Sequence, residues 1–305
     1  MEEFRLNVQN EQQDLRIDKV LADELAGNSR SYIQKLIRDG NILVNGKSVK
    51  ANYKLTEGEE IHVCIPDPEI LSIVPEKISL DILYEDEDLL VVNKPKGMVV
   101  HPAAGHYNNT LVNALLYHCK GNLSGINGIL RPGIVHRIDM DTTGSLVVCK
   151  TDLAHRSLAE QLKEHSITRR YRAIVYGTLK EEGTINAAIG RHPTDRKKMS
   201  IHAKNGKPAV THYRVLKNYR DFTYIECELE TGRTHQIRVH MASINHPLLG
   251  DKVYGPEKCP YKFLQGQTLH ARTLGFCHPR TGKYLEFQAP MPEYFEKLLQ
   301  ILPEK

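Results

Sequence analysis

The sequence predicts an α+β protein built from two unequal domains. Strand and helix patterns follow one another over residues 80–302 without the regular βαβ rhythm of a parallel sheet. Residues 16–65 carry a separate order of two short helices and a hairpin. Three prolines in residues 66–79 indicate a linker between the two patterns. We therefore divide the chain into an N-terminal tail (1–15), a small domain (16–65), the linker (66–79) and a large domain (80–305).

The small domain shows its elements as local signals. Apolar residues recur at helical spacing in residues 17–25 and again in residues 33–37, and Gly40 ends the second helix. Asn45-Gly46 between apolar runs predicts a tight hairpin, and residues 61–65 alternate as a closing strand. In the large domain the same signals predict strands over 89–92, 171–177 and 222–229, and helices over 110–118, 153–165 and 293–302.

The chain carries no signal for a membrane or an oxidising compartment. No run of about 18 apolar residues appears, and the first residues are polar and acidic, unlike a signal peptide. The six cysteines do not have the close spacing of zinc or CxxC redox sites, so we expect buried free thiols. The cytoplasm and a monomeric state are the default expectations.

Positive charge is concentrated in the middle of the chain. Residues 191–207 hold six basic side chains against one acidic side chain, and residues 163–172 hold four against one. Clustered positive charge suits a polyanion such as nucleic acid, although it is also found on solvated loops. Lys197 and Lys198, at the centre of the first cluster, are predicted to contact phosphates.

The segment most able to carry chemistry is residues 131–144, a polar loop before the apolar run 146–148. Its two carboxylates, Asp139 and Asp141, allow several interpretations. They are the residue types of a glycosidase pair and of a divalent metal site, and a D-x-D turn that only shapes a loop is the commonest alternative. The residues alone leave these three interpretations open.

Four motifs in order extend this segment to a family resemblance. His136-Arg137-Ile138-Asp139-x-x-Thr142-Thr143-Gly144 resembles the HRLDxxTSG signature of RluA-type pseudouridine synthases. Lys94-Pro95-x-Gly97, Arg170-Tyr171-x-Ala173 and Gly232-Arg233-Thr234-His235-Gln236-Ile237-Arg238 are similar to three further motifs of that family. The small domain, with Arg16-x-Asp18-x-x-Leu21 and Asn45-Gly46, resembles an S4 RNA-binding domain, which places the chain in the RluD-like branch.

This resemblance implies a fold, a reaction and a substrate class. The large domain is expected to form a mixed, mostly antiparallel sheet. The expected reaction breaks the N1–C1′ bond of a uridine, turns the base and rejoins it through C5, without a cofactor or a metal. The expected substrate is structured RNA, most of all large-subunit ribosomal RNA.

The resemblance also implies roles for single residues. Asp139 is the expected catalytic carboxylate; attack at C1′, addition at C6 and removal of the C2′ proton all remain open for it. Arg233 is expected to pair with Asp139, Tyr171 to stack on the target base, and Ile237 to line the apolar side of the pocket. Three arginines are expected to bind RNA: Arg137 by filling the gap left by the flipped base, and Arg30 and Arg38 on the basic helix face of the S4-like domain.

Two other functions compete with the isomerase. One is a non-catalytic S4-type RNA-binding protein, which the joint presence of Asp139, Tyr171 and Arg233 argues against. The other is a hydrolase that uses Asp139 and Asp141 as a carboxylate pair. A metal site at His136, His235 and His240 is disfavoured because their spacing matches no zinc pattern.

Overall fold

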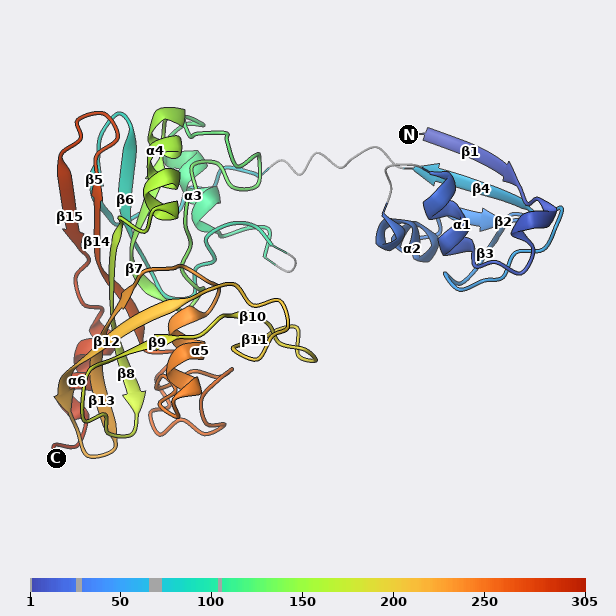
Figure 1. Ribbon diagram of the computed structural model, residues 1–305. Coiled ribbons are helices and arrows are strands. Elements are labelled where there is room, and N and C mark those ends of the chain that lie inside the picture. Colours follow the sequence, from blue (N-terminus) through green and yellow to red (C-terminus); the bar gives the residue numbers. More distant parts are fainter. Residues whose placement is uncertain (1, 26–28, 66–72, 104–105) are drawn as a thin grey trace. The chain divides into compact units, whose positions relative to one another are not determined.

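The computed structural model describes residues 2–25, 29–65, 73–103 and 106–305 (Figure 1). The chain divides into two compact units, Met1–Leu71 and Ser72–Lys305. Each unit combines helices with a sheet, so the predicted α+β class is confirmed. Residues 66–72 of the predicted linker lie outside the described residues, whereas Ile73 already packs against the core of the second unit. Among the described residues, no helix is long and apolar enough to cross a membrane.

The first unit is a four-stranded antiparallel sheet with two helices packed on it. Its strand order is β1-β4-β2-β3. Its core includes Leu21 of the first helix, Ile33 of the second and Val63 of the sheet. Its elements are β1 (Glu2–Asn7), the 3-10 helix η1 (Asn10–Gln12), α1 (Ile17–Glu24), α2 (Arg30–Arg38), β2 (Ile42–Val44), β3 (Lys47–Ser48) and β4 (Glu60–Ile65).

Two features of this unit bear on the predictions. The hairpin at Asn45-Gly46 is confirmed, since it joins β2 to β3 with positive φ at both residues, as its tight turn requires. The N-terminal tail predicted over residues 1–15 is wrong. Strand β1 pairs with β4 from Glu2 opposite Ile65 to Asn7 opposite Glu60. An almost fully exposed edge strand shows no apolar alternation, so the sequence pattern did not reveal it.

The second unit is built on a nine-stranded sheet with the order β5-β6-β7-β14-β8-β13-β12-β9, and β15 pairs with β14. All its ladders are antiparallel except the short β7–β14 contact. Its strands are β5 (Ile82–Glu85), β6 (Leu89–Lys94), β7 (Thr143–Cys149), β8 (Thr168–Tyr176), β9 (Gly183–Asn186), β12 (Val210–Asn218), β13 (Phe222–Leu229), β14 (Leu269–Cys277) and β15 (Tyr284–Gln288). A separate two-stranded ribbon joins β10 (Gly190–Arg191) to β11 (Met199–Ser200).

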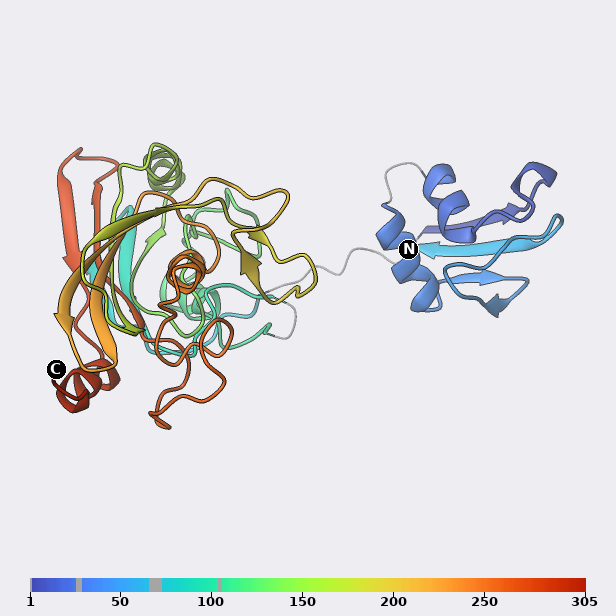
Figure 2. The ribbon, with the colours of Figure 1, turned by 60° about the horizontal axis from the view of Figure 1, so that its bottom comes forward.

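Helices cover both faces of this sheet, and successive residues of its strands therefore enter different cores. On one face, α3 (Leu111–His118) and α5 (Gln236–Ser243) pack over a core that includes Tyr171 and Ala173 of β8. On the other face, α4 (Asp152–Lys163) covers β6 and β7, while α6 (Glu293–Ile301) packs on Ile174 of β8. Figure 2 shows α5 and α6 well separated, with strands of the sheet between them. Tyr171 thus points to the α5 side.

Gly144 allows β7 and β14 to meet in their parallel contact. This pairing joins Thr143 to His270 and Gly144 to Ala271. A Cβ atom on Gly144 would collide with the backbone carbonyl of Ala271, and its φ of +110° is itself unfavourable for other residues. The glycine that closes the HRIDxxTTG motif therefore fixes where the loop before β7 leaves the sheet.

Candidate active site

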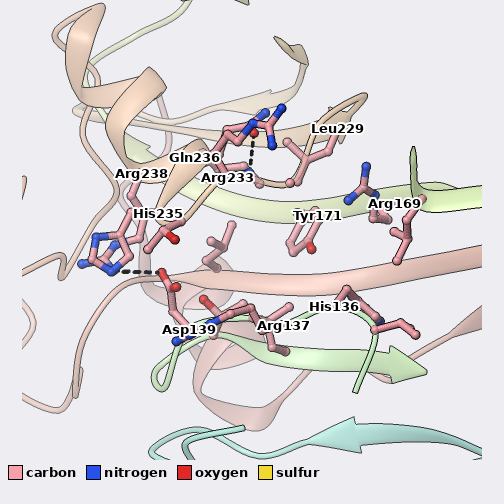
Figure 3. A pocket seen from close by; sticks show the side chains of 18 of the residues that line it. His136, Arg137, Asp139, Arg169, Tyr171, Leu229, Arg233, His235, Gln236 and Arg238 are labelled. Carbon is pink, nitrogen blue, oxygen red and sulfur yellow. Dashed lines mark hydrogen bonds and ion pairs between the residues drawn. The ribbon is translucent and has the colours of Figure 1, made fainter. Parts of the chain in front are cut away.

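A cavity of about 490 Å³ in the second unit opens on the α5 side of the sheet (Figure 3). Its walls come from segments far apart in sequence: the loop before β7, the end of α4 with strand β8, the segment from the end of β13 into α5, and the first residue of β14. Five residues predicted from sequence line it, namely Arg137, Asp139, Tyr171, Arg233 and Ile237.

Asp139 projects into this cavity and forms an ion pair with Arg238. The Nη1 atom of Arg238 donates to Oδ2 of Asp139 at 2.9 Å. The same guanidinium donates from Nε and Nη2 to both carboxylate oxygens of Asp251, at 2.7 and 2.9 Å. The Asp139 side chain keeps 18% of its surface exposed, whereas that of Asp251 is fully buried. Asp139 is therefore the carboxylate of this pair that a ligand can reach.

Arg238 is charged in spite of its burial. Burial disfavours the cation, but the hydrogen bonds to Asp251 and Asp139 outweigh this and raise the pKa of the guanidinium. The guanidinium also lies over the ring of Tyr254, 5.2 Å from the centroid. Because Asp251 holds Arg238 through two parallel hydrogen bonds, the third hydrogen bond is directed at Asp139.

The predicted contact between Arg233 and Asp139 is wrong. The Nε atom of the half-exposed Arg233 donates to the carbonyl of Pro208 at 2.9 Å. Its backbone N–H donates to the Gln236 side chain at 2.9 Å, which fixes the turn before α5 (Figure 3). Both arginines belong to the matched G-R-T-H-Q-I-R segment, and the one inside helix α5 reaches the carboxylate. Arg233 lines the cavity but does not hold Asp139.

Tyr171 and Ile237 form apolar walls of the cavity, together with Leu229 and Leu269. Tyr171 is 7% exposed, and burial raises the pKa of its hydroxyl, so the ring and its O–H remain uncharged. A planar ring beside apolar side chains offers a surface on which a pyrimidine can stack. Figure 3 shows Tyr171 between Asp139 and Arg169.

His235 is a cavity residue for which the sequence predicted no role in the reaction. Its Nε2 lies 4.0 Å from Oδ2 of Asp139, and its Nδ1 lies 2.8 Å from the hydroxyl of Tyr254. It adopts a left-handed conformation, with φ of 57°, at the N-cap of α5. Burial lowers the pKa of the imidazole, which favours the neutral ring. The histidine thus places a neutral polar group beside the candidate carboxylate.

The loop that carries Asp139 is held from both ends. The Nε2 atom of His136 accepts a hydrogen bond from the backbone N–H of Val147 at 3.1 Å, and burial lowers the pKa of this histidine to about 3. The ammonium of Lys94, 1% exposed, donates to the carbonyls of Pro95, Met98 and Met140 at 2.8, 2.8 and 2.9 Å. Met140 directly follows Asp139, so Lys94 ties the catalytic candidate to the turn after β6.

Asp141 does not line the cavity. Its carboxylate lies against Gly266, where a Cβ atom would clash with it. Among the described residues, one group of carboxylates and imidazoles lies close enough to share a metal ion, namely Asp86, Asp88 and His278. Asp141 is not part of it. There Arg280 already donates to both oxygens of Asp88, at 2.6 Å each. The two carboxylates of the D-x-D segment therefore do not face a common ligand space.

The residues predicted to bind RNA lie outside the cavity or at its rim. Arg137 is exposed, and its Nη1 lies 3.4 Å from Nε2 of His101. In the 191–207 segment, Lys197 is exposed and Lys198 is half-buried. This segment is connected to the site, because the backbone N–H of Met199 donates to the Tyr254 hydroxyl that contacts His235.

In the first unit, Arg30 and Arg38 are both exposed on α2. Arg30 donates to the buried carboxylate of Asp18, which also binds Arg16 and Gln34. The carboxylate thus holds two half-exposed guanidinium groups in place. Of the six cysteines, Cys119, Cys149 and Cys227 are buried as predicted, but Cys277 is exposed.

Comparison with known proteins identifies the class of this fold and site. The family model described as RNA pseudouridylate synthase matches residues 88–243, and the S4 domain model matches residues 15–61. The chain belongs to the RNA pseudouridylate synthase family and is an isomerase that acts on RNA uridines. The predicted family, the S4 domain and the predicted enzyme class are thereby confirmed.

Relatives place the chain more closely within the family. It is 50% identical over 296 residues to ribosomal large subunit pseudouridine synthase D of Zymomonas mobilis, covering 94% of this chain and 93% of that protein. It is 53% identical to an uncharacterized RNA pseudouridine synthase, YlyB, of Bacillus subtilis, over 99% of both chains. The solved structure of human RNA pseudouridylate synthase domain containing 1 covers 79% of this chain and is itself covered completely, with 26% identity and a TM-score of 0.58.

Proposed function

We propose that this isomerase converts specific uridines of large-subunit ribosomal RNA and that Asp139 is its catalytic carboxylate. The observation that carries the proposal is the partly exposed Asp139 in a cavity walled by Tyr171 and held by Arg238. Relatives named for the large ribosomal subunit support the substrate. A protein that acts on ribosomal RNA works where ribosomes are assembled, so the proposed location is the cytoplasm.

Each cavity residue has a proposed part in the reaction. A uridine turned out of the RNA enters the cavity and stacks on Tyr171, with Ile237 against its apolar side. Asp139, held in place by the hydrogen bond from Arg238, acts on the base or the sugar of that uridine. The guanidinium balances the carboxylate charge as it changes during the reaction. Two further residues are proposed as positioning residues. Asp251 positions Arg238, and Lys94 positions the loop that carries Asp139.

The remaining predicted site residues are proposed to bind RNA. The exposed Arg137 fills the space that the flipped base leaves, and Arg233 at the cavity wall faces the same RNA segment. Lys197 and Lys198 contact phosphates outside the cavity. Arg30 and Arg38 contact RNA from the S4 domain, where Asp18 presents Arg30 together with Arg16. These contacts are electrostatic and carry little sequence information.

The hydrolase alternative is disfavoured by the position of Asp141. A carboxylate pair requires both groups to reach one substrate bond from the same space. The carboxylate of Asp141 lies outside the cavity, against Gly266. We therefore expect Asp141→Asn to be much milder than Asp139→Asn, whereas a carboxylate-pair hydrolase requires both substitutions to be equally damaging.

The experiment that tests this function is pseudouridine mapping of total RNA from cells with and without the gene. Wild-type protein and Asp139→Asn protein are then supplied to the deleted strain. We expect defined large-subunit uridines to lose pseudouridine in the deletion and to regain it only with wild-type protein. Identical maps in the two strains, or rescue by Asp139→Asn, contradict the proposal.

A further inference from the structure

Arg169 is a buried arginine in the active-site cavity whose charge is not neutralised by the described part of the chain. It is 5% exposed and lies on the same face of β8 as Tyr171, two residues further on. Its Nη2 donates to the backbone carbonyl of Glu230 at 2.8 Å. Its Nε has no hydrogen-bond partner among the described residues, and no carboxylate of those residues lies within 4.0 Å of its guanidinium.

Unlike Arg169, the neighbouring arginines of β8 have acidic partners. Arg170 pairs with Glu228 at 3.2 Å, and Arg172 pairs with Glu226 at 2.9 Å. Both alternate with Arg169 and Tyr171 along β8 and therefore lie on the opposite face of the strand, and both are more exposed than Arg169. Strand β13 thus supplies acidic partners for two arginines of β8, while the most buried arginine of β8 has no such partner among the described residues.

This arrangement has an energetic cost that a bound anion would offset. A buried charge without a counter-charge destabilises a fold, because the charge loses its hydration and gains no ion pair. Burial lowers the pKa of the Arg169 guanidinium, and nearby Arg233 lowers it further. Gly232 leaves room for the group, since a Cβ atom there would lie 2.7 Å from Nη1 of Arg169.

The rest of the cavity has the same sign of charge. Among the described residues of its lining Asp139 is the only acidic one, and Arg238 pairs with it and with Asp251, which is not part of the lining. Arg137, Lys163 and Arg233 add three further cations to the lining. The uracil base is neutral and cannot compensate this charge, whereas every nucleotide of RNA carries a phosphate.

We propose that Arg169 binds a backbone phosphate of the RNA next to the uridine that enters the cavity. The proposal rests on the proposed function, because it takes the RNA substrate to be seated in this cavity. Glu230 holds Nη2 and the Nε atom is buried, so Nη1 is the nitrogen that is left to donate to a phosphate oxygen in the cavity. Arg169 is thus a substrate-binding residue at the end of the cavity opposite Asp139.

The test measures binding of the full chain to an unmodified transcript of large-subunit ribosomal RNA over a range of KCl concentrations. In Arg169→Gln the side chain retains an N–H donor for the Glu230 carbonyl but loses its charge. We expect this variant to bind about tenfold more weakly and its salt dependence to flatten by about 0.7–0.9 in the log–log slope, the value for one phosphate contact. The control is Arg170→Gln, whose guanidinium pairs with Glu228, and its slope should equal that of wild type.

A purely structural role of Arg169 predicts different results. It predicts an unchanged slope in Arg169→Gln, which overturns the proposal. It also predicts a lower melting temperature in Arg169→Met without RNA, whereas removal of an uncompensated charge should leave the melting temperature equal or higher. Unfolding of both variants therefore also contradicts the proposal. If wild-type protein forms no pseudouridine in the transcript, the proposed substrate fails, while the comparison of slopes remains readable.

Discussion

Arg238 connects Asp139 to a second, fully buried carboxylate, Asp251. The guanidinium donates to Asp139 at 2.9 Å and to Asp251 at 2.7 and 2.9 Å. The two hydrogen bonds to Asp251 fix the position of Arg238, and Arg238 in turn fixes Asp139, the carboxylate that faces the cavity. The site therefore has one reactive acid, one arginine that positions it and balances its charge, and one buried acid that positions the arginine.

Arg238→Gln should remove this support and reduce the rate of pseudouridine formation by about 10²–10³-fold, as for the loss of one preorganised electrostatic group. The matched control is Arg233→Gln in the same segment, which leaves the Asp139 contact in place. We expect Arg233→Gln to weaken RNA binding, with a smaller effect on the single-turnover rate. Equal rate losses for the two variants would mean that Arg238 has no special relation to Asp139.

Gly144→Ala should destabilise the second unit by more than its backbone strain alone. A residue with a Cβ at φ of +110° costs about 1–3 kcal/mol, and here the Cβ also meets the Ala271 backbone. The control is Gly128→Ala, which has φ of +74° and no atom within 4 Å of the added Cβ. Urea unfolding of both variants measures the difference. A Gly144 variant no less stable than the Gly128 variant argues against the close approach of β7 and β14.

His136 should make the protein less stable as the pH falls. Burial lowers its pKa in the folded state to about 3, from an ordinary value of 6.5. Between these values the unfolded chain binds a proton that the folded chain does not, so stability is present at pH 7 and is lost as the pH falls through 6.5 towards 3. His136→Gln should flatten this decline, at the cost of some stability at pH 7. Unfolding free energies between neutral and mildly acidic pH test this, with the exposed His202→Gln as the control; an equal slope in all three proteins contradicts it.

Replacement of Lys197 and Lys198 by alanine should weaken RNA binding without a change in the chemical step. The salt slope should fall by about 0.7–0.9 for each phosphate that the variant no longer binds. The measurement is the affinity for a large-subunit transcript at several KCl concentrations. Lys217→Ala is the control, because Glu304 pairs with Lys217 at 2.7 Å. A slope equal to that of wild type in the double variant removes the basic segment from the RNA interface.

Sequence patterns predicted most of the fold because its buried elements repeat at regular spacing. The helices over 110–118 and 293–302 lie within about a residue of α3 and α6, and the strand over 171–177 falls on the second half of β8. Strand β1 was not predicted because almost all its residues are exposed, so its side chains do not alternate between apolar and polar. It is held by backbone hydrogen bonds, which do not depend on the type of side chain.

The site was predicted in its composition but not in its contacts. The G-R-T-H-Q-I-R segment contains two arginines, and spacing alone does not tell which one lies near Asp139. The choice depends on where α5 begins, at Gln236, and on the left-handed residue before it, His235. Asp251 was missed because it comes from a loop more than a hundred residues after Asp139 and shares no motif with it.

The most direct test of Asp139 is a single-turnover reaction of purified wild-type, Asp139→Asn and Asp141→Asn proteins with an unmodified large-subunit transcript. Pseudouridine per RNA is measured at enzyme concentrations that saturate binding. We predict no detectable product with Asp139→Asn, although it is folded and binds the RNA, and a rate within about tenfold of wild type with Asp141→Asn. Product formation by Asp139→Asn at a rate close to that of wild type would contradict the assignment of Asp139 as the catalytic carboxylate.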